Sequence, residues 1–111
     1  MQRKARFSGG VERERAWVVS FSGELDIWKE DEVEAKLELV DGTRPVVVDL
    51  SEVRYLDSAF LSALIRLRRR LPNIRITLVV QTPSVRRVFA LTEMDRLFEI
   101  VSFRPNLPEE E

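Results

Sequence analysis

The chain of 111 residues contains no cysteine and no histidine. The absence of cysteine excludes disulfides, thiolate nucleophiles and thiolate metal sites. The absence of histidine removes the usual base of a serine nucleophile, and no lysine lies near Ser58 in sequence to take its place. There is also no Walker-type phosphate loop, and no loop has the carboxylate spacing of a calcium site. We therefore expect a protein that is not an enzyme and that holds neither a metal nor a cofactor.

The chain also lacks a long apolar run and a strong excess of charge of one sign. No apolar stretch approaches the ~18 residues that a membrane span needs, and the first ten residues, MQRKARFSGG, are too polar for a secretory signal. The net charge of -1 gives the chain as a whole no attraction to nucleic acid or to anionic membranes. With 44% hydrophobic residues and only four glycines, the composition is typical of one folded domain. We expect a soluble cytoplasmic protein without a membrane span.

The pattern of apolar residues predicts strands that alternate with helices. The expected strands cover residues 15–21, 46–50, 74–80 and 98–101, with an earlier strand over 3–7 before a hairpin turn; the expected helices cover 28–40, 58–71 and 82–92. The apolar stripe of the first helix consists of Trp28, Val33, Leu37 and Val40. This order predicts an α/β domain over residues 1–103, followed by a frayed acidic tail over 104–111.

The helix expected over 58–71 is amphipathic. At about 100° per residue, Phe60, Leu64, Leu67 and Leu71 fall within one narrow arc, which Leu61 and Ile65 extend. Arg68 falls inside this arc, so we expect its aliphatic stem to pack at the edge and its charged head to reach water. The run RLRRR is interpreted either as a patch for nucleic acid or phosphate, or as a solvated face whose cations suit the C-terminal end of a helix. We favour the solvated face because aromatic residues do not interleave the arginines.

Asp57 and Ser58 stand where the extended segment gives way to this helix. Both are residue types that cap helices. A serine at this place lies near the positive end of the helix dipole, where free backbone N–H groups can donate hydrogen bonds to a phosphate. Such a phosphate would be repelled by the negative charge of Asp57, and Glu24 and Asp26 are further candidates for the same repulsion. Two interpretations stay open: Ser58 only caps the helix, or Ser58 is a modified switch.

Three stretches of the sequence together resemble the STAS domain of bacterial anti-sigma factor antagonists. They are SGELD over 22–26, VVVDLSEVRYLDSAFLSAL over 46–64 and ITLVVQTPSVRRVFALTEMDRLFEIV over 76–101. They carry the family's early aspartate, its strand that ends in Asp-Leu-Ser, its Asp-Ser helix start and its closing Pro-x-Val helix, all in order. The resemblance implies an α/β fold with a mixed β-sheet and helices packed mainly on one face.

The same resemblance implies a mechanism of partner switching. The unphosphorylated protein binds an anti-sigma factor that is also a serine kinase, and this binding frees a sigma factor for transcription. The kinase phosphorylates the antagonist with ATP that the kinase holds, the antagonist dissociates, and a PP2C-type phosphatase resets it. The family's phosphoacceptor falls on Ser58. The resemblance implies a partner-binding surface made by Asp26, Asp57, Ser58, Ala59 and Phe60.

Two residues depart from the family pattern beside Ser58. Ala59 replaces a second hydroxyl and leaves Ser58 as the only local acceptor, and Phe60 replaces a glycine. Phe60 either obstructs a kinase or anchors a different interface, or else it packs inward, which its place on the apolar arc favours. Two other functions remain open. One is an accessory STAS subunit of a lipid-transport ATPase or of a stress-sensing scaffold, with Ser58 as an interface residue, and the other is a nucleic-acid binder that uses the basic helix.

Overall fold

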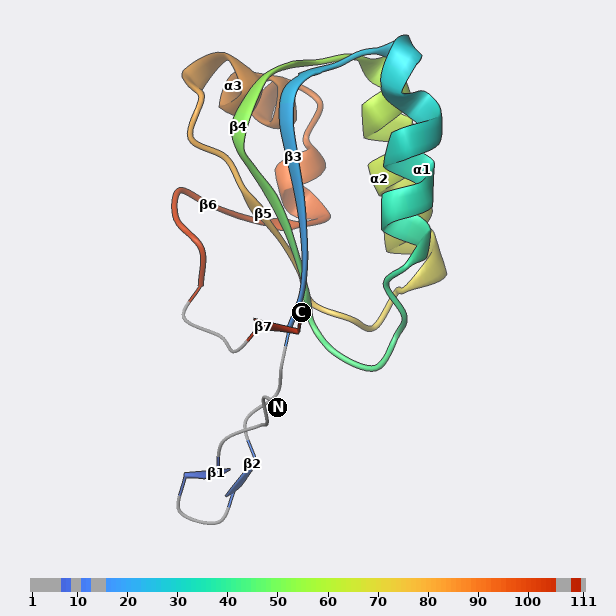
Figure 1. The fold of residues 1–111 in the computed structure, drawn as a ribbon. Helices are drawn as coiled ribbons and strands as arrows, with labels where there is room; N and C mark the ends of the chain where they lie inside the picture. Colours follow the sequence, from blue (N-terminus) through green and yellow to red (C-terminus); the bar gives the residue numbers. More distant parts are fainter. Residues whose placement is uncertain (1–6, 9–10, 13–15, 106–108, 111) are drawn as a thin grey trace.

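The computed structural model describes residues 7–8, 11–12, 16–105 and 109–110 of the chain (Figure 1). The main sheet has the strand order β6-β5-β4-β3-β7, and its neighbouring strands are parallel throughout. Its strands are β3 (Ala16–Leu25), β4 (Val46–Leu56), β5 (Ile76–Val79), β6 (Glu99–Val101) and β7 (Glu109–Glu110). The helices are α1 (Glu30–Glu38), α2 (Ser58–Arg70) and α3 (Pro83–Leu91), with two 3-10 turns, η1 (Ile27–Lys29) and η2 (Met94–Arg96). The expected α/β class is confirmed.

A hairpin of two short strands forms a second sheet. In it, β1 (Phe7–Ser8) pairs with β2 (Val11–Glu12) in antiparallel fashion. One mixed sheet was expected. Among the described strands, the parallel pairs instead form the main sheet, and the antiparallel pair forms a separate one. Apart from Phe7, the strand expected over 3–7 lies outside the described residues, as do residues 106–108 and 111 of the expected tail. The division into a domain over 1–103 and a tail over 104–111 stays a prediction.

Strand β4 continues to Leu56, beyond the end that was expected at Leu50. On one side, its residues Val46–Asp49 pair with β5. On the other side, the pairing with β3 continues until Leu25 lies opposite Leu56. The segment SEVRYL is more polar than VVVDL, so its extended form depends on pairing with β3 and not on burial of both faces.

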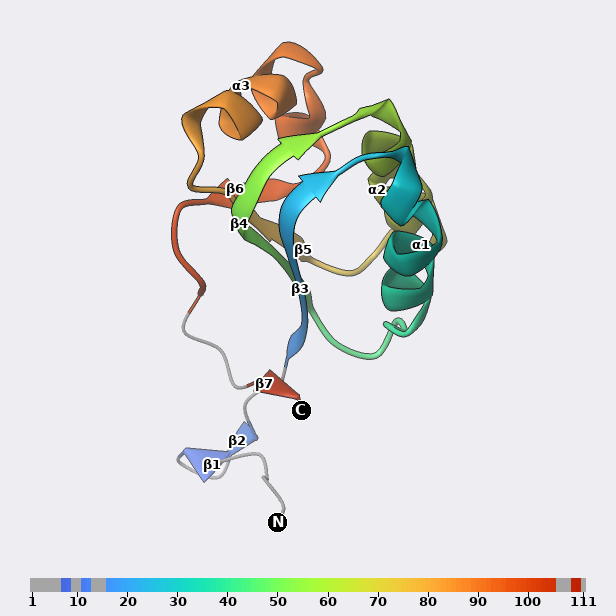
Figure 2. The same cartoon turned by 45° about the horizontal axis from the view of Figure 1, so that its top comes forward.

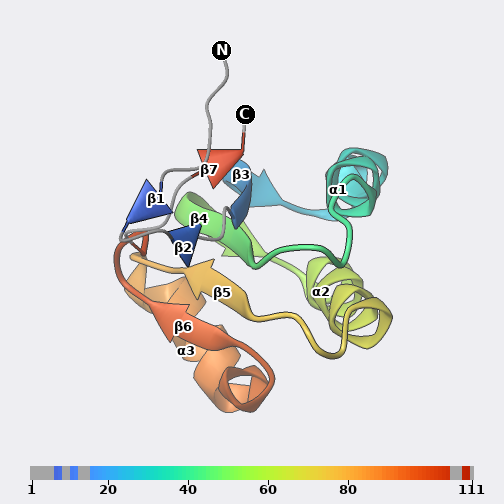
Figure 3. The same ribbon diagram turned by 90° about the horizontal axis from the view of Figure 1, so that it is seen from below.

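All three helices pack on the same face of the main sheet. In β4, the side chains of Val46, Val48 and Leu50 belong to a buried cluster that also contains residues of α1, α2 and α3. The helix residues of this cluster are Val33, Leu37, Phe60, Ala63, Leu64, Leu67, Val85 and Phe89. Figure 3 shows α1 and α2 lying side by side along the sheet. The expectation of helices mainly on one face is therefore confirmed, and so is the burial of the apolar arc of α2.

The opposite face of the sheet carries a buried carboxylate at its centre. Asp49 is only 8% exposed, and its Oδ2 accepts a hydrogen bond of 2.6 Å from Nε of Arg104. Its Oδ1 accepts a second bond, of 2.9 Å, from the backbone N–H of Ser51. Burial by itself would raise the pKa of Asp49, but the hydrogen bonds from Ser51 and the charge of Arg104 outweigh it, so the pKa lies below its ordinary value. The segment after β6 is thereby fastened to the sheet.

The burial of α2 leads to a test of stability. Leu64→Ala should lower the free energy of unfolding by about 2–5 kcal/mol, because a fully buried side chain is removed and a cavity remains. Urea unfolding followed by circular dichroism measures this change. Leu91→Ala is the matched control, since Leu91 is 74% exposed at the end of α3, and it should change the stability by less than about 0.5 kcal/mol. Equal stability of Leu64→Ala and the wild-type chain would contradict the burial.

The pair of Asp49 and Arg104 predicts a loss of stability in acid. A lowered pKa means that the pair contributes fully above the unfolded pKa of about 3.9, and that this contribution disappears as the pH falls through the folded pKa. Asp49→Asn should therefore be less stable than the wild-type chain at pH 7, by about 1–3 kcal/mol, and the difference should shrink toward pH 2. Urea unfolding across this range measures it, with Glu52→Gln, exposed on the same strand, as the control. Parallel pH profiles for Asp49→Asn and the wild-type chain would rule out this role.

Candidate functional site

The candidate site lies at the edge of the sheet where β3 and β4 end together (Figure 2). Leu25 and Leu56 are the last paired residues of these strands. The backbone N–H of Asp57 still donates a 3.2 Å hydrogen bond to the carbonyl of Leu25. Asp26 and Asp57 therefore leave the sheet next to each other, and a helical turn begins directly after each of them. The structure thus brings together the two aspartates that the sequence singled out.

Gly23 sets the direction in which β3 reaches this edge. Its φ of 78° lies in the left-handed region, which glycine enters at low cost. The register between β3 and β4 shifts between Gly23 and Glu24, as it also does between Ser20 and Ser22. Such irregularities bend a strand and increase its twist. The glycine of the SGELD segment therefore has a structural role in aiming the end of β3.

Asp57, and not Ser58, is the N-cap of α2. The backbone of Asp57 is extended, and its Oδ1 accepts hydrogen bonds from the N–H groups of Ala59 at 3.0 Å and Phe60 at 3.2 Å. Ser58 is the first residue inside the helix, and its side chain is exposed. The interpretation of Ser58 as a mere cap is therefore wrong, because the preceding aspartate already bonds the N–H groups that a cap would reach.

Asp26 has the same role one strand away. Its carboxylate accepts a 3.1 Å hydrogen bond from the N–H of Trp28, and its carbonyl accepts one of 2.9 Å from the N–H of Lys29. These two bonds fix the turn η1, after which α1 begins at Glu30. The edge consequently has two turns of the same design, each begun by an aspartate.

The arrangement around Ser58 changes what a phosphate would meet there. Free N–H groups of the helix start were expected to receive it, but those of Ala59 and Phe60 already bond Asp57. A phosphate on Ser58 would retain the favourable helix dipole, yet it would stand beside the carboxylate of Asp57 without these two donors. Chemically, the site presents an accessible hydroxyl among carboxylates.

Phe60 packs inward, as its place on the apolar arc predicted. Its side chain is 3% exposed and meets the ring of Phe21 edge to face, with 5.5 Å between the ring centroids. Obstruction of Ser58 by this ring is therefore excluded. The partner-binding role expected for Phe60 stays a prediction; its ring is buried, while Ala59 is half-buried and Ser58 exposed.

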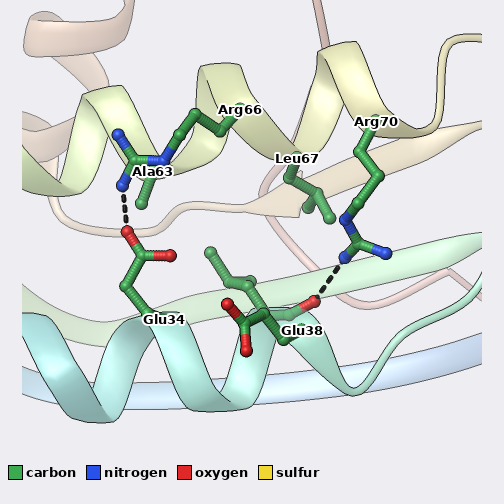
Figure 4. A pocket seen from close by; sticks show the side chains of 7 residues that line it. Glu34, Glu38, Ala63, Arg66, Leu67 and Arg70 are labelled. Carbon is green, nitrogen blue, oxygen red and sulfur yellow. Dashed lines mark hydrogen bonds and ion pairs between the residues drawn. The ribbon is translucent and has the colours of Figure 1, made fainter.

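Two arginines of the run RLRRR, Arg66 and Arg70, connect α2 to α1 and to the residues that follow α1. Arg66 forms an ion pair with Glu34 across the shallow hollow between α1 and α2 (Figure 4). Arg70 donates hydrogen bonds to the carbonyl of Leu37, in the last turn of α1, at 2.8 Å and to the carbonyl of Val40, just after α1, at 3.0 Å. These contacts give charged donors to carbonyls at the end of α1, where the backbone bond from the N–H of Val40 to Leu37 is long, at 3.4 Å. They favour a structural role over a nucleic-acid patch.

Arg68 departs from its expected position. Its Nη2 donates hydrogen bonds of 2.6 Å to the carbonyls of both Leu71 and Ile74, and its Nη1 donates one of 3.2 Å to that of Leu97. The head was expected to reach water, but it binds the turn after α2 instead. The helix stops at Pro72-Asn73, and the carbonyl of Leu71 there accepts only a long backbone bond of 3.4 Å from the N–H of Ile74, so the guanidinium supplies shorter, charged donors to this turn.

Three exposed apolar residues at the same edge were missed in the sequence. Trp28 is 90% exposed, Ile27 is 62% exposed and Tyr55 is 52% exposed. Trp28 was expected in the buried stripe of a helix over 28–40, and this was wrong. Asp26 begins a 3-10 turn at Ile27, and that turn precedes α1 and directs Trp28 outward. No signal in the apolar pattern separates these two cases.

The part of the chain that the structure describes has neither a metal-binding cluster nor a membrane-spanning helix. Among these residues, no group of three or more acidic, histidine or cysteine side chains could hold a metal ion. None of the described helices is long and apolar enough to cross a membrane.

Comparisons with known proteins agree with this fold. The sequence model of a family described as "Mlab, STAS domain" matches residues 10–102. The crystal structure of an anti-sigma factor antagonist from Mycobacterium paratuberculosis is similar, with 29% identity and a TM-score of 0.72 over 90% of this chain and 84% of that one. The structure of the anti-sigma factor antagonist SpoIIAA in its unphosphorylated form is 18% identical, with a TM-score of 0.53 over 97% of this chain and 86% of that one, and shows the shared fold. The resemblance drawn from the sequence motifs is confirmed.

The capping geometry predicts opposite results for neighbouring substitutions. Asp57→Ala should lower the free energy of unfolding by about 0.5–2 kcal/mol, because the N–H groups of Ala59 and Phe60 lose their acceptor. Ser58→Ala should change it by less than about 0.5 kcal/mol, because the exposed hydroxyl caps nothing. Thermal and urea unfolding measure both. A larger loss for Ser58→Ala than for Asp57→Ala would show that the serine is the cap.

Proposed function

The chain belongs to the STAS domain family, and we propose that it is an anti-sigma factor antagonist that works by partner switching in the cytoplasm. The unphosphorylated chain binds an anti-sigma factor serine kinase, and the sigma factor held by that kinase is freed for transcription. The kinase transfers the γ-phosphoryl group of its own ATP to Oγ of Ser58, and ADP remains with the kinase. The modified chain dissociates, and a PP2C-type phosphatase removes the phosphate.

The observation that carries this proposal is the separation of cap and acceptor at the start of α2. Asp57 bonds the helix N–H groups, so the exposed hydroxyl of Ser58 has no structural task that a kinase would disturb. Phe60 is buried and leaves the approach to the serine open. Modification can therefore change the surface without opening the helix.

The charges at the edge support release after phosphorylation. A phosphate brings a charge of about -1.5 to -2 at neutral pH. It would stand directly beside Asp57, and Asp26 leaves the sheet next to Asp57. A partner that fits the neutral serine would have to bury this charge, whose burial without a counter-charge is costly. A coupling of about 1–3 kcal/mol corresponds to a 5- to 150-fold loss of affinity.

The alternative of an accessory STAS subunit, serving a lipid-transport ATPase or a stress-sensing scaffold, uses the same edge differently. There, Ser58 would be a contact residue that is never modified. Both functions predict a protein interface at Asp26, Asp57, Ser58 and Ala59. They differ in the chemistry that Ser58 undergoes, so a phosphorylation experiment discriminates between them.

Ser58 should be the residue modified when the purified chain is incubated with ATP and the anti-sigma factor kinases of its source organism, each in turn. Mass spectrometry of the digested product locates the phosphate. Ser58→Ala should bind the same kinase without being modified, and Ser58→Asp should bind it at least 5-fold more weakly. Ser62→Ala is the control, because Ser62 is an exposed serine one turn later on α2, and it should be modified like the wild-type chain. Undiminished phosphorylation of Ser58→Ala would sink the assignment.

A further inference from the structure

Trp28 is an exposed aromatic residue that lies two positions after Asp26 of the candidate site. It is 90% exposed, and Ile27 beside it is 62% exposed. Tyr55, at the end of β4, is 52% exposed and lies opposite Glu24 of β3. In Figure 1, the connection from β3 to α1 and the connection from β4 to α2 lie at the same end of the molecule. Apolar surface therefore adjoins the start of α2, where Ser58 lies.

The backbone beneath Trp28 is fixed before any partner arrives. The carboxylate of Asp26 accepts a hydrogen bond of 3.1 Å from the backbone N–H of Trp28, and the carbonyl of Asp26 accepts one of 2.9 Å from the N–H of Lys29. A side chain on a fixed turn loses less conformational freedom on binding than one on a flexible loop. Tryptophan and tyrosine are also the residues that most often dominate the energy of a protein interface. The turn η1 thus has the character of a preformed anchor.

The surroundings of this anchor are acidic. The segments 24–32 and 52–58 contain seven acidic and two basic residues, whereas the remaining residues carry 12 acidic and 16 basic ones. One of the two basic residues, Arg54, pairs with Glu24 at 2.9 Å. The negative charge of the chain is therefore concentrated around Trp28 and Ser58. Such a surface repels nucleic acid and anionic lipid and attracts a cationic protein surface.

We propose that Trp28, with Ile27 and Tyr55 also exposed at this end of the sheet, is the anchor by which the partner at the Ser58 edge holds the chain. The occupant is a protein surface with an apolar pocket for the indole and a rim of lysine and arginine side chains. This inference rests on the proposed function, which makes the partner the kinase that modifies Ser58. The anchor determines how slowly the complex dissociates, and the acidic surroundings determine how fast it forms.

The anchor also defines what phosphorylation has to overcome. Attraction between the acidic edge and a cationic rim is screened by salt, because it acts between largely solvated groups. Burial of Trp28 is not screened, so it keeps the unphosphorylated complex together at physiological salt. A phosphate on Ser58 must enter the same closely packed contact, where its dehydration opposes the burial of the indole.

The test uses the kinase that modifies Ser58 and measures its association and dissociation rates with the unphosphorylated full chain by surface plasmon resonance. Trp28→Ala should raise the Kd about 30-fold or more, mainly through faster dissociation, and Trp28→Phe should recover part of the loss. Leu91→Ala is the control, because it also removes an exposed apolar side chain, 74% exposed on α3. Its Kd should stay within twofold of the wild-type value. Asp31→Asn should slow association at 50 mM salt and not at 500 mM.

The binding data separate a failure of the anchor from a failure of the proposed function. If the wild-type chain binds the kinase and Trp28→Ala binds equally well, the anchor is refuted while the proposed function stands. If Leu91→Ala weakens binding as much as Trp28→Ala, the loss is not specific to the edge, and the anchor is refuted again. If no anti-sigma factor kinase binds or modifies the wild-type chain, the proposed function fails and the anchor fails with it.

Discussion

The parallel pairing of β3 with β4 extends to Leu25 and Leu56, and the position of that last pair determines where the residues of the candidate site lie. Two strands that end in register release their next residues side by side. Those residues are Asp26 and Asp57, and each begins a helical turn by accepting hydrogen bonds from the backbone N–H groups ahead of it. The bend at Gly23 and the length of β4 matter because they place the ends of β3 and β4 side by side.

The start of α2 assigns the helix cap and the proposed phosphate acceptor to two adjacent residues. Asp57 carries the hydrogen bonds that the helix needs, and Ser58 is exposed beside it. The third residue of the helix, Phe60, is a core residue that meets Phe21 of β3. The position at which the sequence resemblance implies a glycine thus carries a core residue here, and the serine remains accessible. The consequence is a surface that can change its charge while the fold beneath it is unchanged.

Much of the fold follows from the sequence, because the period of apolar residues reports which face is buried. The arc of α2 and the buried strand VVVDL were predicted correctly for this reason. The choice of cap was not predictable, because aspartate and serine both suit the position and only the extended backbone of Asp57 decides. The arginine contacts were also hidden, since Arg68 reaches the carbonyl of Leu97, far away in the sequence. The exposure of Trp28 depends on a single 3-10 turn, which apolar periodicity does not encode.

The central claim is that one phosphate on Ser58 converts a surface that binds its partner into one that does not. The most direct measurement is the Kd of the kinase complex for the unmodified chain and for the chain phosphorylated fully at Ser58, compared at one salt concentration. The account predicts a Kd that is about 5- to 150-fold higher after phosphorylation, with the circular dichroism spectrum unchanged. Equal Kd values for the two forms would contradict it.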